Sequence, residues 1–162
     1  MAWSRHLHTR VLWKKANVGG EAPMKEEQIM KEQLIQEALE ARKQAYAPYS
    51  RFQVGAAVLA GGKIFRGCNV ENASYGLTNC AERTAVFKAV SEGEKKIEAI
   101  AVVADTEGPV APCGACRQVL AEFCDSGTRI YLSNLHGNTE EWTISRLLPG
   151  AFSAEDMEQD SE

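Results

Sequence analysis

Residues 97–124 read IEAIAVVADTEGPVAPCGACRQVLAEFC and contain a predicted strand, loop and helix in succession. The first eight, Ile97 to Ala104, are rich in Val and Ile, which predicts a buried strand. Residues 105–112 carry turn-forming Asp, Gly and Pro, and predict a loop. Cys113 to Cys124 predicts a helix that ends near Gly127. A buried strand followed by a helix is typical of an α/β protein.

Three elements are predicted on the N-terminal side of this stretch. They are a helix at 34–46, a hairpin at 54–70 and a second helix at 80–92. The first helix has apolar residues at helical spacing and is ended by Pro48. The hairpin strands are joined through Gly61-Gly62. Asn79 is the expected N-cap of the second helix, and Gly93 is its expected stop.

Two short strands are predicted on the C-terminal side, at 129–133 and around Trp142, joined by a turn at His136-Gly137-Asn138. A parallel crossover needs about a dozen residues or more, so these two strands should pair antiparallel. A short helical segment around Leu147-Leu148 follows. The order of elements predicts a three-layer α/β/α sandwich around a five-stranded mixed sheet.

Length and composition are those of one globular domain. The chain has 162 residues, of which 44% are hydrophobic and 25% charged, and this excludes disordered and coiled-coil classes. No apolar run reaches the roughly 18 residues of a membrane helix, so no membrane association is expected.

The charge is unevenly distributed along the chain. Residues 1–23 hold four basic residues and one acidic residue, which leaves a net charge of -7 from residue 24 onward. Such an acidic body lacks the basic surface of a nucleic-acid-binding protein, and a small-molecule partner is expected.

Three segments are predicted from these patterns: an extension at 1–23, the folded domain at 24–153 and an acidic tail at 154–162. The extension has no clear period and lacks a secretory signal, although its basic, acid-poor composition is weakly similar to a transit peptide. It is expected to be disordered or non-native.

The five cysteines favour metal binding or catalysis over disulfides. Their odd number, in a chain without a secretory signal, indicates reduced thiols and a cytoplasmic location. Cys113 and Cys116 are one helical turn apart, and Cys80 supplies a third thiolate. Three protein ligands plus water is the arrangement of a catalytic zinc site. Glu82, two residues after Cys80, is offset from the ligand direction and is a candidate proton shuttle.

Three thiolates on Zn²⁺ leave a net charge of -1, which weakens activation of water unless it is offset. Two predicted helix N-termini point toward the ligands and supply roughly +0.5 charge each. Arg83 can donate a hydrogen bond to a cysteine sulfur and withdraw further electron density. The sequence therefore supports a catalytic zinc site electrostatically.

Five motifs stand out along the chain: Cys80-Ala81-Glu82, Pro112-Cys113-Gly114-Ala115-Cys116, the stretches APYSRFQVGAA at 47–57 and GCNVENASY at 67–75, and LLPGAF at 147–152. Through these motifs the chain resembles the small homotetrameric cytidine deaminases, a family of zinc nucleoside deaminases, over residues 24–153. The resemblance implies hydrolytic deamination of cytidine and deoxycytidine to uridine and deoxyuridine with release of ammonia, a reaction of pyrimidine salvage.

The resemblance also implies residue roles. One zinc ion per subunit would be held by Cys80, Cys113 and Cys116. Glu82 would be the general acid/base, and Arg83 would support the ligands. The implied substrate contacts are Phe52, Asn69, Glu71, Ala73, Tyr75 and Phe152.

Among these contacts, Asn69 and Glu71 are implied to hold the ribose 3′-hydroxyl, and Phe52 to stack on the pyrimidine. Tyr75 and Phe152 are implied to reach a neighbouring subunit's active site, so the expected assembly is a homotetramer with shared sites.

The residues alone leave other interpretations open. Cys113 and Cys116 are compatible with a thioredoxin-like redox pair, and Cys68 or Cys124 is compatible with a fourth ligand of a structural zinc. Taken alone, Phe52 and Phe152 are more typical of core packing, and Asn69 and Glu71 are compatible with ordinary turn polarity.

Rival functions also remain at this point. They are deamination of nucleic acid, deamination of a nucleoside-like antibiotic such as blasticidin S, and a zinc-binding module without turnover. The acidic body argues against the first of these. The short turn before the last strand argues against it too, because the polynucleotide-acting relatives of the family that this chain resembles generally place a helix there.

Overall fold

The computed structural model describes residues 22–157. Its helices are α1 (Ala22–Arg42), α2 (Ala81–Ser91), α3 (Gly114–Phe123) and α4 (Ile144–Leu147), with two short 3-10 helices, η1 (Tyr75–Leu77) and η2 (Ala154–Met157). Its strands are β1 (Val54–Ala60), β2 (Lys63–Cys68), β3 (Ile97–Ala104), β4 (Cys124–Asn134) and β5 (Thr139–Trp142).

The five strands form one mixed sheet in the order β2-β1-β3-β4-β5. Only β3 and β4 run parallel, and α3 provides the crossover between them. The other three neighbouring pairs are antiparallel, including β4 with β5. The predicted mixed sheet and its antiparallel last pair are therefore confirmed.

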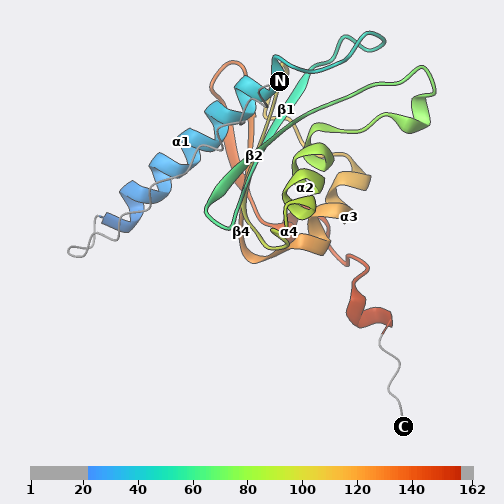
Figure 1. Ribbon diagram of the computed structural model, residues 1–162. Coiled ribbons are helices and arrows are strands. Elements are labelled where there is room, and N and C mark those ends of the chain that lie inside the picture. Colours follow the sequence, from blue (N-terminus) through green and yellow to red (C-terminus); the bar gives the residue numbers. More distant parts are fainter. Residues whose placement is uncertain (1–21, 158–162) are drawn as a thin grey trace, which may run out of the picture.

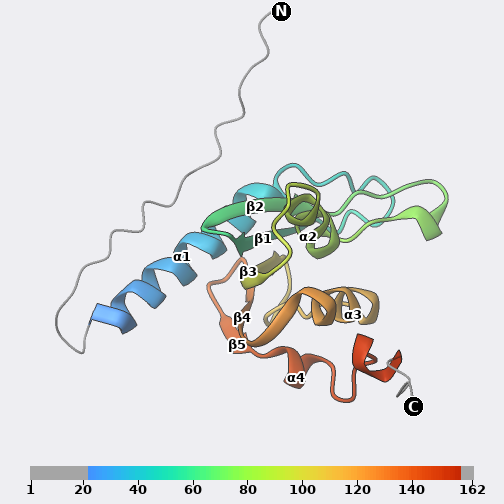
Figure 2. The same cartoon turned by 60° about the horizontal axis from the view of Figure 1, so that its bottom comes forward.

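Helices cover both faces of the sheet (Figures 1 and 2). On one face α1 buries Leu34 and Ala38 against Ala57 and Ala101. On the other face lie the buried residues of α2, α3 and α4, a set that includes Ala81, Ala85, Val86, Leu120 and Leu147. Strands β1 and β3 contribute side chains to the hydrophobic cores on both faces of the sheet, because successive residues of a strand point to opposite faces. This is the predicted three-layer α/β/α sandwich.

Two glycines allow these helices to approach the sheet closely. A Cβ on Gly55 would stand 2.0 Å from the Ala38 carbonyl oxygen of α1, and one on Gly67 would stand 2.4 Å from the Ala81 carbonyl oxygen of α2. Both neighbours are backbone atoms of packed helices, which cannot move aside cheaply. Gly67 therefore fixes the depth at which the N-terminus of α2 sits on the sheet.

Some predicted boundaries differ from the structure. The N-cap of α2 is Cys80, not Asn79. Asn79 instead forms an extended bridge with Val70, and its side chain donates to Thr84 Oγ1. The first helix ends at Arg42, before the predicted stop at Pro48, because the chain turns there and Tyr46 bridges to Val70.

Other features agree with the sequence or lie beyond the structure. Gly93 has a φ of 96° and follows the C-cap of α2, as predicted. Residues 1–21 of the predicted extension and 158–162 of the predicted tail lie outside the described residues. Within the described part, none of the helices combines the length and apolar character needed to cross a membrane.

Candidate functional site

Three cysteine sulfurs meet where the N-termini of α2 and α3 come together. Cys80 is the N-cap of α2, Cys113 is the N-cap of α3, and Cys116 lies in the first turn of α3. The Sγ atoms of Cys80 and Cys113 are 3.8 Å apart, and those of Cys113 and Cys116 are 3.4 Å apart. All three sulfurs lie within 4.8 Å of one another.

This spacing fits one zinc ion. Sulfurs bound tetrahedrally at ~2.3 Å from zinc stand roughly 3.8 Å apart. Among residues 22–157, the potential metal ligands that cluster are these three cysteines. Cys68 and Cys124 lie outside the cluster, so neither supplies the fourth ligand of a closed structural site. The donor set is thus the three-ligand kind that keeps an open position.

The site favours a thiolate at Cys80. The Cys116 thiol, and after it the Arg83 guanidinium, hydrogen-bond this sulfur and hold the pKa of Cys80 well below its usual range, although burial opposes them. Arg83 Nη2 donates to Cys80 Sγ at 3.4 Å. The hydrogen bond with Cys80 raises the pKa of the Cys116 thiol in turn. A preformed thiolate is the form that binds metal.

Glu82 places a carboxyl group beside the sulfurs. It is the second residue of α2 and only 5% exposed. Burial raises the pKa of this carboxyl to about 7, helped by the negative charge of Cys80 and opposed by a backbone hydrogen bond and one with Cys116. A carboxyl group with a pKa near neutrality can both accept and release a proton.

Asn69 connects a second group of predicted residues. This side chain is buried, accepts from the backbone N–H of Val54 at 2.8 Å and donates to the Phe52 carbonyl at 2.7 Å. Phe52 itself is 42% exposed, so it is not the core aromatic of the alternative interpretation. Asn69 therefore fixes the backbone from which the Phe52 ring projects.

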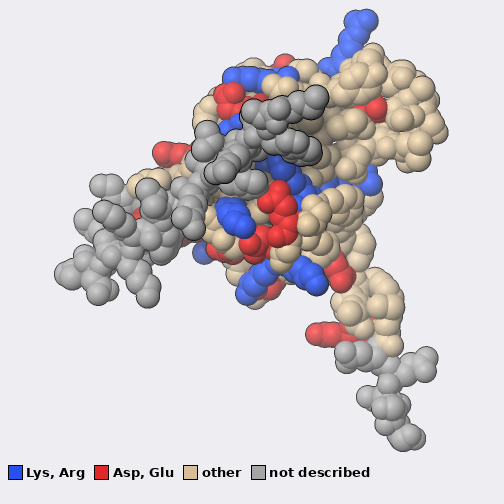
Figure 3. Space-filling view, viewed as in Figure 1, with Lys and Arg blue, Asp and Glu red and all other residues tan. Residues whose placement is uncertain are grey.

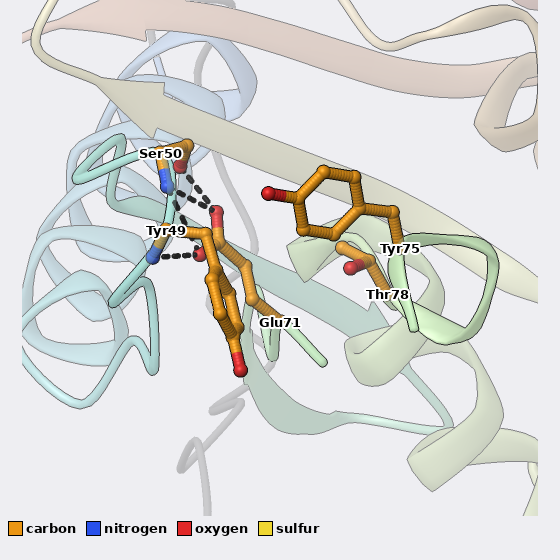
Figure 4. A pocket seen from close by; sticks show the side chains of 5 residues that line it. All are labelled: Tyr49, Ser50, Glu71, Tyr75 and Thr78. Carbon is orange, nitrogen blue, oxygen red and sulfur yellow. Dashed lines mark hydrogen bonds between the residues drawn. The ribbon is translucent and has the colours of Figure 1, made fainter. Parts of the chain in front are cut away.

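Glu71 lies in a pocket of about 240 Å³ with Tyr49, Ser50, Tyr75 and Thr78 (Figure 4). Its carboxylate accepts from the backbone N–H groups of Tyr49 and Ser50, at 2.8 and 3.2 Å, and from the Ser50 hydroxyl. The Ser50 hydroxyl, followed by these backbone donors, lowers the pKa of Glu71. The group is thus held as an acceptor, and it is not merely a polar turn residue.

A short backbone link joins the pocket to the cysteines. Val70, between Asn69 and Glu71, pairs with Asn79, and each donates its N–H to the other's carbonyl at 2.9 Å. Asn79 immediately precedes Cys80. The residues predicted to contact a sugar and those predicted to bind metal are therefore carried on two paired segments.

Exposed aromatic rings gather near this pocket. Tyr75 is 73% exposed and meets Tyr49 edge-on, with ring centroids 5.7 Å apart. Ala73, in the same loop, is exposed too. Figure 3 shows that the region formed by these loops carries fewer charged side chains than the rest of the visible face. The large exposed apolar side chains of this region are Tyr46, Tyr49, Phe52, Val70, Tyr75 and Leu77.

Phe152 belongs to the segment between α4 and η2, which leads away from the sheet (Figure 1). It is 60% exposed, which excludes core packing within its own described chain. Its carbonyl accepts from Gln118 Nε2 on α3 at 2.9 Å.

Sequence reasoning assigned no role to Tyr49 or Ser50. Both lie in the stretch 47–57 that carries the resemblance, but their contacts to Glu71 span 22 and 21 residues. The available local signal is a serine two residues before Phe52, which can cap the Phe52 N–H in a tight turn.

Comparison with known proteins gives consistent matches. Residues 28–132 match the family described as "Cytidine and deoxycytidylate deaminase zinc-binding region". A cytidine deaminase of Halalkalibacterium halodurans is 66% identical over 128 residues, which cover 78% of this chain and 97% of the relative. One of Sporosarcina psychrophila is 62% identical, with 81% and 97% covered.

A solved structure gives the same match. The crystal structure of cytidine deaminase from Burkholderia pseudomallei is 53% identical in sequence and has a TM-score of 0.73. The match covers 75% of this chain and 98% of that one.

Proposed function

Because this chain belongs to the cytidine deaminase family, we propose that it hydrolyses cytidine and deoxycytidine to uridine and deoxyuridine with release of ammonia. The observation that carries the proposal is the group of three cysteine sulfurs with a buried carboxyl group beside it. Hydrolytic deamination needs an activated water and a group that moves its protons.

We propose that Cys80, Cys113 and Cys116 hold one zinc ion. Zinc at this position supplies a Lewis acid that makes water nucleophilic near neutral pH. Arg83 donates to the Cys80 sulfur and so offsets the excess negative charge of three thiolates. The N-termini of α2 and α3 act in the same direction, since both begin at ligand residues.

Glu82 is proposed to move the protons. As a carboxylate it takes a proton from the attacking water and gives it to N3 of the pyrimidine. It then takes the proton of the new hydroxyl at C4 and carries it to the departing amine, which leaves as ammonia as the C4 carbonyl forms. A pKa of about 7 suits both directions of transfer near neutral pH.

The remaining residues are proposed to hold the nucleoside. Phe52 stacks on the pyrimidine, while Asn69 and Glu71 bind the ribose 3′-hydroxyl and Ala73 adds a contact from the adjoining loop. The pocket around Glu71 is lined by one carboxylate and no lysine or arginine among the described residues, which suits a sugar hydroxyl.

The substrate class is tested by one comparison of rates. The purified chain should lower the ultraviolet absorbance of cytidine and deoxycytidine, whereas deoxycytidine 5′-monophosphate, single-stranded DNA and blasticidin S should react far more slowly. Preferential turnover of the nucleotide, of DNA or of the antibiotic would overturn the assignment to nucleosides.

The exposed aromatic loops and the exposed Phe152 support a homotetramer with shared active sites. Large exposed apolar patches mark interfaces. Tyr75 and Phe152 are proposed to reach the site of a neighbouring subunit.

The catalytic domain is proposed to span residues 24–153. It is proposed to act in the cytoplasm, because all five cysteines are free thiols.

Removal of residues 150–162 should raise KM sharply while zinc remains bound. The deletion removes Phe152, whose ring is proposed to lie over the base in the site of a neighbouring subunit. Base–aromatic stacking is worth roughly 1–3 kcal/mol, which corresponds to about 5- to 150-fold in affinity. Phe152→Ala, which keeps the backbone contact to Gln118, should reproduce most of the effect in steady-state kinetics.

Subunit mixing tests whether the site is shared. Truncated subunits have an intact Glu82, and Glu82→Gln subunits have an intact Phe152, so mixed tetramers should regain activity. A fully active truncated monomer, or no recovery in verified mixed tetramers, would refute sharing.

Arg83→Ala should leave zinc bound at neutral pH but move both zinc loss and the pH–rate profile to higher pH. Arg83 stabilises the Cys80 thiolate, so its removal raises the pKa of that thiol. Zinc binds the deprotonated ligand and is lost as pH falls. The pH at which half of the zinc is lost is therefore higher in the variant. Zinc content after dialysis at several pH values measures this, with Arg83→Lys as the control. Superimposable curves would remove Arg83 from the mechanism.

A further inference from the structure

The Ser50 hydroxyl lies between a sugar-binding residue and a base-binding residue of the proposed site. Its Oγ donates to Glu71 Oε1 and accepts from the backbone N–H of Phe52 at 3.0 Å. A single side chain thus connects the carboxylate of Glu71 to the peptide group that carries the Phe52 ring.

The carboxylate of Glu71 is held on one side only. Figure 4 shows its oxygens directed at Ser50 and the Tyr49 backbone, with Tyr75 across the pocket. Three described groups donate to it: the Ser50 hydroxyl, the Tyr49 N–H, and the Ser50 N–H, which is shared between both oxygens at 3.2 and 3.3 Å. A carboxylate offers about four acceptor positions, so three donors leave room for a hydroxyl of a bound ligand.

The backbone between Ser50 and Phe52 adopts an unfavourable conformation. Arg51 has a φ of 59°, the one positive φ outside glycine among residues 22–157. Left-handed backbone is disfavoured for residues with a Cβ and persists where neighbouring contacts impose it. Those contacts are present here, since Phe52 is held at its N–H by Ser50 and at its carbonyl by Asn69.

We propose that Ser50 is a positioning residue that orients Glu71 toward the ribose 3′-hydroxyl and, through the N–H of Phe52, couples this contact to the placement of the ring over the base. The inference rests on the proposed function, because it requires Glu71 to receive the sugar hydroxyl. The lowered pKa of Glu71, caused first by Ser50, agrees with the contact.

The kinetic test compares 2′-deoxycytidine with 2′,3′-dideoxycytidine, which differs from it only in lacking the 3′-hydroxyl. Ser50→Ala should lower kcat/KM for deoxycytidine roughly 10-fold, mainly through KM, as expected for loss of a charged hydrogen bond. With dideoxycytidine the loss should be no more than about 3-fold, because the contact that Ser50 supports is already absent. Ser50→Thr should restore most of the activity, and Ser91→Ala, on the exposed end of α2, should change neither substrate's kinetics.

A second measurement does not depend on turnover. The pKa of the Glu71 carboxyl, followed by carbon-13 nuclear magnetic resonance, should rise toward its ordinary value in Ser50→Ala and stay low in Ser50→Thr. Equal losses with both substrates, or an unchanged pKa of Glu71, would overturn the positioning role and leave the proposed function intact. A wild-type chain that deaminates neither substrate would overturn the proposed function instead.

Discussion

Glu82→Gln should abolish nearly all cytidine deamination while the fold and the zinc content stay unchanged. Glutamine has the shape of glutamate and preserves packing at this buried position. It cannot take or give a proton near neutral pH, and general acid–base steps contribute typically ~10²–10⁴-fold to a rate. Steady-state kinetics with cytidine, with zinc measured on the same sample, give the comparison.

The matched control is Glu122→Gln on α3, where the side chain is exposed and outside the site. Its activity should equal that of the wild type. A Glu82→Gln enzyme that kept more than about a tenth of the wild-type rate would rule out Glu82 as the proton shuttle.

Cys113→Ala should lose zinc and, with it, activity. Two remaining thiolates are fewer protein ligands than zinc sites use, whether structural or catalytic. Cys113 is exposed and caps α3 with its backbone rather than its side chain, so the metal-free variant should keep its secondary structure. Zinc analysis and circular dichroism of the purified variant separate metal loss from unfolding.

Cys68→Ala is the control for this experiment, because Cys68 is partly buried and lies outside the cluster. It should retain one zinc per chain. A Cys113→Ala protein with full zinc and normal activity would show that Cys113 is not a ligand.

The sequence predicted the fold well because the decisive signals are local. The apolar run of β3 and the short turn at His136-Gly137-Asn138 determine a buried strand and an antiparallel last pair without long-range knowledge. The three cysteines could be grouped for a similar reason, since each lies in a motif at the start of a predicted helix. Boundaries were less predictable: Asn79 is an ordinary helix cap by composition, but its pairing with Val70 moves the cap to Cys80.

Long-range side-chain contacts could not be predicted. Ser50 and Glu71 are separated by 21 residues, and only the pairing of their segments in the folded chain brings the hydroxyl to the carboxylate. The exposure of Phe152 and Tyr75 is likewise a tertiary property, since an aromatic residue in a sequence does not reveal whether its own domain covers it.

Turnover of cytidine by the zinc-loaded chain is the property on which the proposed function most directly depends. The measurement is the loss of cytidine's ultraviolet absorbance, with ammonia release followed in parallel, for protein as purified, stripped by a chelator and restored with zinc. We expect deamination with one zinc per chain, loss of activity when the zinc is stripped and return of activity when it is restored. A zinc-loaded, folded chain that leaves cytidine unchanged would contradict the proposed function.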